Sequence, residues 1–331
     1  MMIRRFLGFA LAGVITLSLV TGAAQSASQS KEWKPEREIE FVVPSAPGGG
    51  SDLNARTVAD LAQKNKFSPY ALMVVNKPGG SGAVAFSYVN TKKGDPYTLM
   101  VLHSGQVMGS YVNNWAVKAN DLTYVATLAL DELTLGVRKD GPYKDFNGLL
   151  KAVKDKPESI KIGGSQRGNS DHLSFELLNK YTRSKFTYVM FNSSGEVMSA
   201  LLGGHIDAGI FNPMESIGQV EAGRVIPVAT FSKERLPGVF KDVPTFGELG
   251  YKKIQVTEIR AIAGPPQMPP AAVKFYAEML KKITETEEWK KNYIERSLLT
   301  NHYLNAYVTK KFHEQQIQLY TKTFREVGLM K

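Results

Sequence analysis

Residues 39–52 read IEFVVPSAPGGGSD, a short apolar run that ends in a glycine-rich turn. Residues 71–82 repeat the arrangement as ALMVVNKPGGSG, and helix-like sequence follows both turns. Glycine lets backbone N–H groups approach a ligand closely, and a helix that starts at such a turn directs the positive end of its dipole to the same place. Two such turns so near each other predict a pincer for an anion.

Strand-like and helix-like segments alternate on both sides of these turns. The predicted strands form two series, at residues 39–43, 71–75 and 97–102 and at residues 160–163, 186–191, 208–211 and 225–230. Two further apolar stretches, 123–137 and 254–263, are expected to cross between the series, and residues 271–329 are helical by composition. Ligands of open parallel sheets bind outside the carboxyl ends of the strands. We therefore expect a hinged clamp of two βα lobes joined by two crossing strands.

The N-terminus has the pattern of a secretory signal. Arg4 and Arg5 precede the uncharged apolar run Phe6–Val20, and small residues follow, so cleavage is predicted near Ala24. A membrane anchor is the alternative, but the run is shorter than the roughly 20 residues that a span needs. The chain has 331 residues, which favours two domains, and it has no cysteine for disulfide or thiolate chemistry.

Charge limits the class of partner. The net charge is +10, which favours acidic partners such as anionic metabolites. No basic stretch is interleaved with aromatic residues, so nucleic acid is not an expected partner. Neither glycine turn closes in Lys-Ser/Thr, and the spacings typical of zinc and calcium sites are missing from the sequence. We expect no cofactor and no metal.

Two other motif readings concern the second turn. Gly80-x-Gly82-x-x-Ala85 matches a dinucleotide fingerprint in form, but no acidic residue follows at the distance that ribose binding needs. Gly79–Ala83 approximates the nucleophile elbow of a serine hydrolase, and His103 and His172 lie near predicted strand ends. An exported serine hydrolase that uses Ser81 is therefore the alternative function.

Two arginines lie in segments expected to face a cleft. Arg167 is inside the turn at residues 164–170, and Arg260 is in the second crossing. A guanidinium fork suits a bidentate clamp on a carboxylate. A salt bridge within the protein or simple exposure is the alternative for each.

Several short motifs occur together in one order along the chain. They lie at residues 42–52, 75–82, 95–99, 170–173, 201–207, 242–245 and 263–266. Together they resemble the Bug/TctC family, the periplasmic solute receptors of tripartite tricarboxylate transporters. The resemblance covers nearly the whole chain after the signal sequence.

The resemblance implies an α/β type II periplasmic binding protein without catalytic activity. The expected parts are a signal peptide at 1–24, domain I at 28–130 and 257–331, and domain II at 131–256. In such receptors the two domain I turns, here Ala46–Asp52 and Gly79–Gly82, grip one carboxylate through backbone groups and ordered water. The domain II turn, here Ser165–Ser170, reads the rest of the ligand. Family ligands include di- and tricarboxylates, acidic amino acids and aromatic acids.

These arguments together predict an exported receptor, a monomer in the periplasm. It would close on an organic carboxylate and deliver it to the membrane permease subunits of a tripartite transporter. Arg260 stands where many members carry an aromatic residue, and Arg167 where small residues are usual, so we expect a second carboxylate on the ligand. The predicted ligand-binding residues are Ala46, Gly48, Gly49, Gly50, Ser51, Asp52, Gly80, Ser81, Gly82, Ser104, Ser165, Arg167, Asn169, Ser170, Asn212 and Arg260.

Overall fold

A computed structural model describes residues 32–330 of the protein, apart from Gly49, Gln166 and Asn192. The chain from Trp33 onward forms one compact unit. The predicted signal peptide, residues 1–24, lies outside the described residues. Within the described part, no helix combines the length and the apolar character that crossing a membrane requires.

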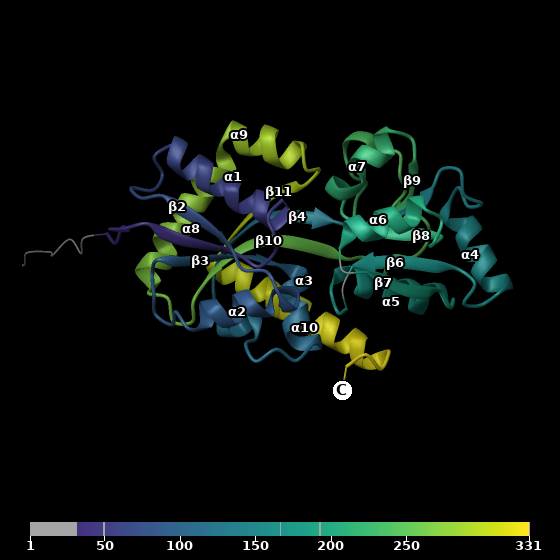
Figure 1. The fold of residues 1–331 in the computed structure, drawn as a ribbon, viewed down its shortest axis with the longest axis horizontal. Helices are drawn as coiled ribbons and strands as arrows, with labels where there is room; N and C mark the ends of the chain where they lie inside the picture. Colours follow the sequence, from purple (N-terminus) through teal and green to yellow (C-terminus); the bar gives the residue numbers. More distant parts are fainter. Residues whose placement is uncertain (1–31, 49, 166, 192, 331) are drawn as a thin grey trace, which may run out of the picture. The chain divides into compact units, whose positions relative to one another are not determined.

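Six strands form the first sheet, in the order β11-β4-β10-β3-β1-β2 (Figure 1). They are β1 (Ile39–Val43), β2 (Leu72–Asn76), β3 (Thr98–His103), β4 (Thr123–Glu132), β10 (Thr257–Gly264) and β11 (Thr300–Asn305). β1 runs parallel to β2 and β3, whereas β10 is antiparallel to β3 and β4, and β11 is antiparallel to β4. Because β1 and β2 are parallel neighbours, the two glycine-rich turns that follow them meet at one edge of the sheet.

Apolar side chains on both sides of β1 explain why helices cover both faces of this sheet. Ile39, Phe41 and Val43 are fully buried in an apolar cluster with α1 (Gly50–Lys64) and α8 (Pro270–Glu285). Val42 is buried in a second cluster on the other face, with side chains of α2 (Ala83–Asn90), α3 (Ser104–Val112) and α10 (Ala306–Glu326). Burying one such side chain contributes about 1.5–3 kcal/mol. The helices on both faces hold the strand ends, and so the turns, in place.

Five strands form the second sheet, in the order β7-β6-β8-β5-β9. They are β5 (Thr134–Arg138), β6 (Lys161–Ser165), β7 (Thr187–Phe191), β8 (Ala208–Phe211) and β9 (Val225–Thr230). β6 is parallel to β7 and β8, and β5 is antiparallel to β8 and β9. Its helices are α4 (Phe146–Asp155), α5 (Ser170–Thr182), α6 (Ser194–Leu202) and α7 (Pro213–Glu221). Short 3-10 helices occur at Gly80–Gly82, Ala119–Asp121 and Gly238–Phe240.

Two strands of the first sheet lead to and from the second. β4 ends at Glu132, and one residue, Leu133, separates it from β5. β10 pairs with β4 from Thr257 opposite Glu132 to Gly264 opposite Thr123. Figure 1 shows β4 and β10 extending toward the elements of the second sheet. The predicted α/β class with two crossing strands is confirmed. The domain boundaries stay a prediction, because no division of the compact unit tests them.

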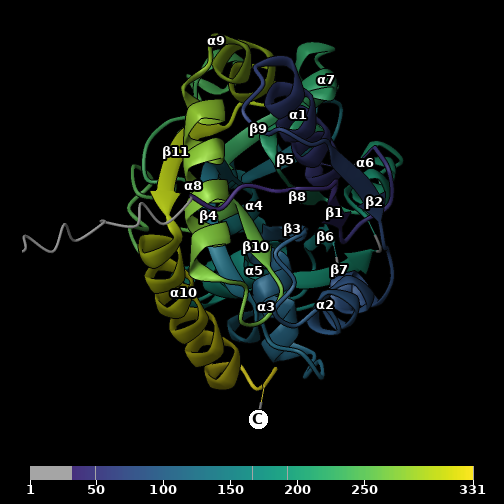
Figure 2. The same ribbon diagram turned by 90° about the vertical axis from the view of Figure 1, so that its left-hand side faces the viewer.

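The prediction that residues 271–329 are helical is wrong in one respect, because this region also contains a strand. After α8 come α9 (Glu287–Trp289) and a π-helix (Lys290–Glu295), and then β11 adds an edge strand to β4. β11 has the sequence TNHYLN, which is poor in strong helix formers, and its last residue, Asn305, caps α10 by accepting a bond from the Val308 N–H at 3.1 Å. Figure 2 shows β11 between α8 and α10 on the same flank.

Candidate functional site

A cavity of about 480 Å³ lies where the glycine-rich turns of the first sheet face strand ends of the second. Its wall contains backbone and small side chains of the glycine-rich turns, the side chains of His103, Gln106 and Glu258 from β3, α3 and β10, and hydroxyl, amide and carboxylate side chains from the second sheet. Eight of the predicted residues line it: Ala46, Gly50, Ser51, Ser81, Gly82, Ser165, Asn169 and Asn212.

Asp52 holds the first turn in shape from inside the protein. Its carboxylate accepts bonds from the Gly48 N–H at 2.9 Å, from Arg56 Nε at 2.9 Å and from Asn76 Nδ2 at 3.0 Å. Burial alone would raise the pKa of Asp52, but these hydrogen bonds outweigh burial and lower that pKa to about 2. Asp52 therefore stays ionised and fixes the loop ahead of α1, without itself lining the cavity.

The second turn has an unusual run of left-handed backbone. Gly79, Gly80, Ser81 and Gly82 all have positive φ, at 129°, 56°, 57° and 114°. A Cβ on Gly82 would lie 3.1 Å from Gln106 Cγ and 3.4 Å from Trp115, so a side chain is also crowded there. A positive φ is unfavourable for a residue with a side chain, such as Ser81. Such strained conformations are concentrated at functional sites. The turn leads directly into α2, whose N-terminus carries the positive end of the helix dipole.

The second sheet contributes a hydrogen-bonded group at the start of α5. Asp171 Oδ2 accepts bonds from the Ser165 N–H at 2.8 Å and from Ser165 Oγ at 2.7 Å. Asn169 donates to Ser165 Oγ at 3.0 Å and caps α5 by accepting from the His172 N–H at 3.1 Å. Burial, with the charge of Glu258, raises the pKa of Asp171 to about 7 despite the bonds from Ser165. Asp171 lines the cavity.

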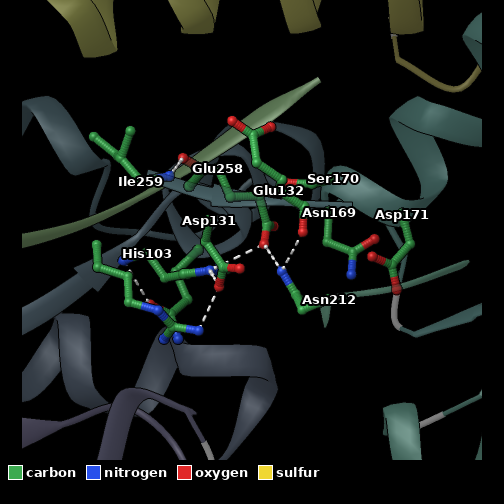
Figure 3. Close-up of polar contacts among 12 residues, drawn as sticks. His103, Asp131, Glu132, Asn169, Ser170, Asp171, Asn212, Glu258 and Ile259 are labelled. Atoms are coloured by element: carbon green, nitrogen blue, oxygen red, sulfur yellow. Dashed lines mark hydrogen bonds and ion pairs between the residues drawn. The ribbon is translucent and has the colours of Figure 1, made fainter. Parts of the chain in front are cut away.

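Beside the cavity lies a buried charge network (Figure 3). His103 Nε2 is 3.1 Å from Glu258 Oε2 and 3.9 Å from Asp131 Oδ2, and Arg260 forms an ion pair with Asp131. Asn212 Nδ2 donates to Glu258 Oε2 at 2.9 Å. Burial alone would lower the pKa of His103, but the charge of Glu258 and hydrogen bonds with both carboxylates raise it to about 9. His103 is therefore protonated at neutral pH.

The network includes ligand types that metals use. One ligand atom from each of His103, Asp131 and Glu258 lies within 4.8 Å of the others. However, Arg260 and His103 already supply positive charge to the two carboxylates, and Asn212 supplies a further donor. Internal ion pairs account for this arrangement without a metal.

The remaining predicted residues lie away from the cavity wall. Ser104 is buried and its Oγ accepts from the Ile259 N–H at 2.8 Å, and Ser170 Oγ is 3.1 Å from the Tyr320 hydroxyl. Gly80 and Arg167 line a second hollow of about 430 Å³ with Trp115, Met190 and Phe191, and this hollow adjoins the cavity at Ser81, which lines both. Gly48 is in the first turn but is not part of the wall, and Gly49 lies outside the described residues.

Arg260 and Arg167 are not brought together. Arg260 is 5% exposed, pairs with Asp131 and lies against the start of α1, where a Cβ on Gly50 would meet its guanidinium at 2.7 Å. The residues that sequence reasoning missed are His103, Asp171, Glu215 and Glu258 in the wall and Asp131 behind it. Asp131 and Glu258 could have been predicted from the sequence, because they are charged residues inside apolar crossing segments.

The alternative role of Ser81 as a nucleophile requires a histidine bonded to it. Among the described residues, no hydrogen bond joins it to a histidine, and His103, which shares the cavity, directs Nε2 to Glu258. The turn around Ser81 has the form of a binding loop at a helix start.

Comparison with known proteins identifies the family. The family described as tripartite tricarboxylate transporter family receptor, TctC, matches residues 55–329. The chain belongs to the TctC receptor family. TctC proteins are periplasmic solute-binding receptors, a class distinct from enzymes, and the resemblance noted from the sequence motifs is confirmed.

Individual relatives of this TctC receptor agree with that assignment. A UPF0065 protein of Cupriavidus necator is 26% identical over 97% of each chain. The periplasmic binding protein BugD has a TM-score of 0.78 at 22% identity, over 90% of this chain and 99% of its own. A Rhodopseudomonas palustris protein solved with adipate has a TM-score of 0.80 at 23% identity, over 89% and 98%. These structures confirm the predicted periplasmic binding fold.

Proposed function

We propose that this TctC receptor captures an organic carboxylate in the cavity between the two sheets and delivers it to a membrane permease. The observation that supports this most strongly is the pair of turns at Gly48–Ser51 and Gly79–Gly82, each at the start of a helix. Backbone N–H groups and helix dipoles at such positions favour a negative charge. The adipate complex of the R. palustris protein is consistent with a carboxylate ligand.

Capture would proceed by closure about the crossing strands. The ligand carboxylate docks on the turns of the first sheet, and the second sheet then approaches with Ser165, Asn169 and Asn212. Family membership supports a permease as the partner and the periplasm as the location, with the signal peptide removed near Ala24. We propose that the receptor acts as a monomer, and we propose no cofactor.

Isothermal titration calorimetry of the purified protein tests this function. Bound acid is first removed by unfolding and refolding, and hexanoate, adipate and 6-aminohexanoate are then titrated. At least one should bind saturably and raise the melting temperature. If no carboxylate binds, or if ester turnover appears and disappears in Ser81→Ala, the receptor function is contradicted and the hydrolase alternative gains support.

A matched pair of variants tests the role of the second turn. Gly82→Ala should weaken carboxylate binding at least tenfold, because Gly82 has φ of 114° and a crowded Cβ position. Gly218→Ala on α7 is the control, since no atom lies within 4 Å of the added Cβ and its φ is ordinary for a helix. The circular dichroism spectrum of each variant shows whether it remains folded.

A further inference from the structure

The cavity wall is chemically asymmetric. Among the described residues that line it there is no lysine or arginine, and the one basic side chain, His103, forms an ion pair with Glu258. Three carboxylates line the same cavity: Asp171, Glu215 and Glu258. The turns of the first sheet contribute no acidic side chain to the wall. Acidic character is therefore confined to the side opposite the glycine-rich turns and to the crossing strand β10.

Two helix starts at the cavity, those of α5 and α7, already hold carboxylates of the chain itself. Asp171 is in the first turn of α5, and Glu215 is in the first turn of α7, where its Oε2 accepts from the Asn212 N–H at 3.3 Å. A helix N-terminus can otherwise bind an anionic ligand. With these carboxylates in place, a second ligand carboxylate would meet like charge there instead of free N–H donors.

Each asparagine amide on this side already donates a hydrogen bond within the protein. Asn169 Nδ2 donates to Ser165 Oγ, and Asn212 Nδ2 donates to Glu258. In contrast, an acceptor remains available: Asp171 is 5% exposed, and no hydrogen bond from another described residue reaches its Oδ1. Glu215 is exposed within the cavity. This side of the cavity thus offers acceptors for a positively charged donor.

Neither arginine changes this balance. Arg260 is buried and paired with Asp131, and Arg167 does not line the cavity but the hollow that adjoins it at Ser81. The expectation of a second carboxylate rested on these two side chains as ligands. Without them at the wall, the charge pattern of the cavity favours a different ligand class.

We propose that the ligand is a zwitterion, with its carboxylate on the glycine-rich turns and a cationic nitrogen held among Asp171, Glu215 and Glu258. This inference rests on the proposed receptor function and assigns its substrate class. A net-neutral amino or guanidino acid whose two charged groups are separated by a chain has the required chemistry. A dicarboxylate of the same length does not.

Calorimetry with ligand pairs of matched length tests the proposal. The pairs are 4-aminobutanoate with succinate and 6-aminohexanoate with adipate, and hexanoate serves as the ligand with one charge. For at least one length, the amino acid should bind at least tenfold more tightly than the dicarboxylate and than hexanoate. Equal or tighter binding of the dicarboxylate at both lengths would overturn the proposal and leave the receptor function standing, whereas no binding of any acid would contradict the receptor function itself.

Variants of the cavity carboxylates test whether they bind the cationic nitrogen of the ligand. Asp171→Asn and Glu215→Gln should each reduce the preference for the amino acid at least fivefold while hexanoate affinity stays within twofold. Glu215 is exposed, so Glu215→Gln is informative even if Asp171→Asn is unstable. Glu221→Gln, at the exposed end of α7, is the control and should leave every affinity unchanged. An unchanged preference in both cavity variants would contradict the assignment.

Discussion

The Nε2 atom of His103 lies 3.1 Å from the Glu258 carboxylate, and this ion pair joins the end of β3 to β10 at the cavity wall. Glu258 is 3% exposed and the His103 side chain 18%, so neither is fully hydrated. A buried charge is stable only when paired. The pair therefore keeps His103 protonated across the physiological pH range.

Replacing Glu258 with glutamine should lower the pKa of His103 from about 9, because the negative charge that offsets the effect of burial on the imidazolium is removed. The imidazole resonances of His103 followed by NMR through a pH titration measure this change. Glu176→Gln is the control, since Glu176 lies 3.5 Å from His172 and not from His103. A His103 pKa that stays near 9 in Glu258→Gln would show that Asp131 alone sustains it.

Arg260 is predicted to be structural. In Arg260→Met, Asp131 keeps a buried charge with only His103 near it, so the free energy of unfolding should fall by about 3–5 kcal/mol. Asp131→Asn combined with Arg260→Met should recover part of this loss, because it removes the uncompensated charge. Urea unfolding measures both effects.

The exposed pair Arg235–Glu248 supplies the control for that experiment, and Arg235→Met should change stability little. The double variant Asp131→Asn with Arg260→Met loses one negative and one positive buried charge, and it should still bind carboxylates. If it is stable but has lost carboxylate binding, Arg260 acts on the ligand after all, as the sequence suggested.

The sequence predicted the parts of the site that depend on local structure. Strand ends and glycine turns follow from neighbouring residues, and the structure places these elements as expected at β1, α1 and β2. The charge pairs do not follow from local sequence. Asp131 and Arg260 are separated by 129 positions, and they meet because β10 pairs with β4 and β3 in a register that puts Glu258 opposite Asp131 and Arg260 opposite His103.

Residues 300–305 illustrate the same limit. The segment was expected to be helical from the composition around it, but the free edge of β4 pairs with it as β11. Tertiary pairing thus overrides the weak local preference of a six-residue stretch. Likewise, the position of Arg167 in the lining of a hollow with Trp115 depends on packing that its turn sequence does not encode.

Thermal stability should fall as the pH rises from 7 to 9. Folding raises the pKa of Glu132 to about 8, mainly through burial, and that of His103 to about 9. A group with a raised pKa stabilises the folded state below its ordinary pKa, and this stability is lost as the pH rises through the folded value. The melting temperature should therefore drop by about 4 °C or more over this range.

Glu132→Gln should flatten that dependence and raise the melting temperature at pH 8, because it removes a carboxyl group whose Oε2 has no hydrogen-bond partner among the described residues. Glu221→Gln, on the surface, should keep the original slope. Differential scanning calorimetry at four pH values gives the comparison. A slope in Glu132→Gln as steep as in the natural sequence would assign the effect to other groups.

The pH dependence of ligand binding should depend on the charge of the ligand. Asp171 has a pKa raised to about 7 by burial and by the charge of Glu258, with Glu215 as a further acidic neighbour and Ser165 as its hydrogen-bond donor. A cationic nitrogen favours the ionised carboxylate, so 6-aminohexanoate should bind up to about tenfold more tightly at pH 8 than at pH 6. Adipate should show the opposite trend, because a protonated Asp171 can donate to its second carboxylate. Asp171→Asn should remove both trends, and calorimetry at pH 6 and pH 8 measures them. Tighter binding of 6-aminohexanoate at pH 6 would place its ammonium group away from Asp171.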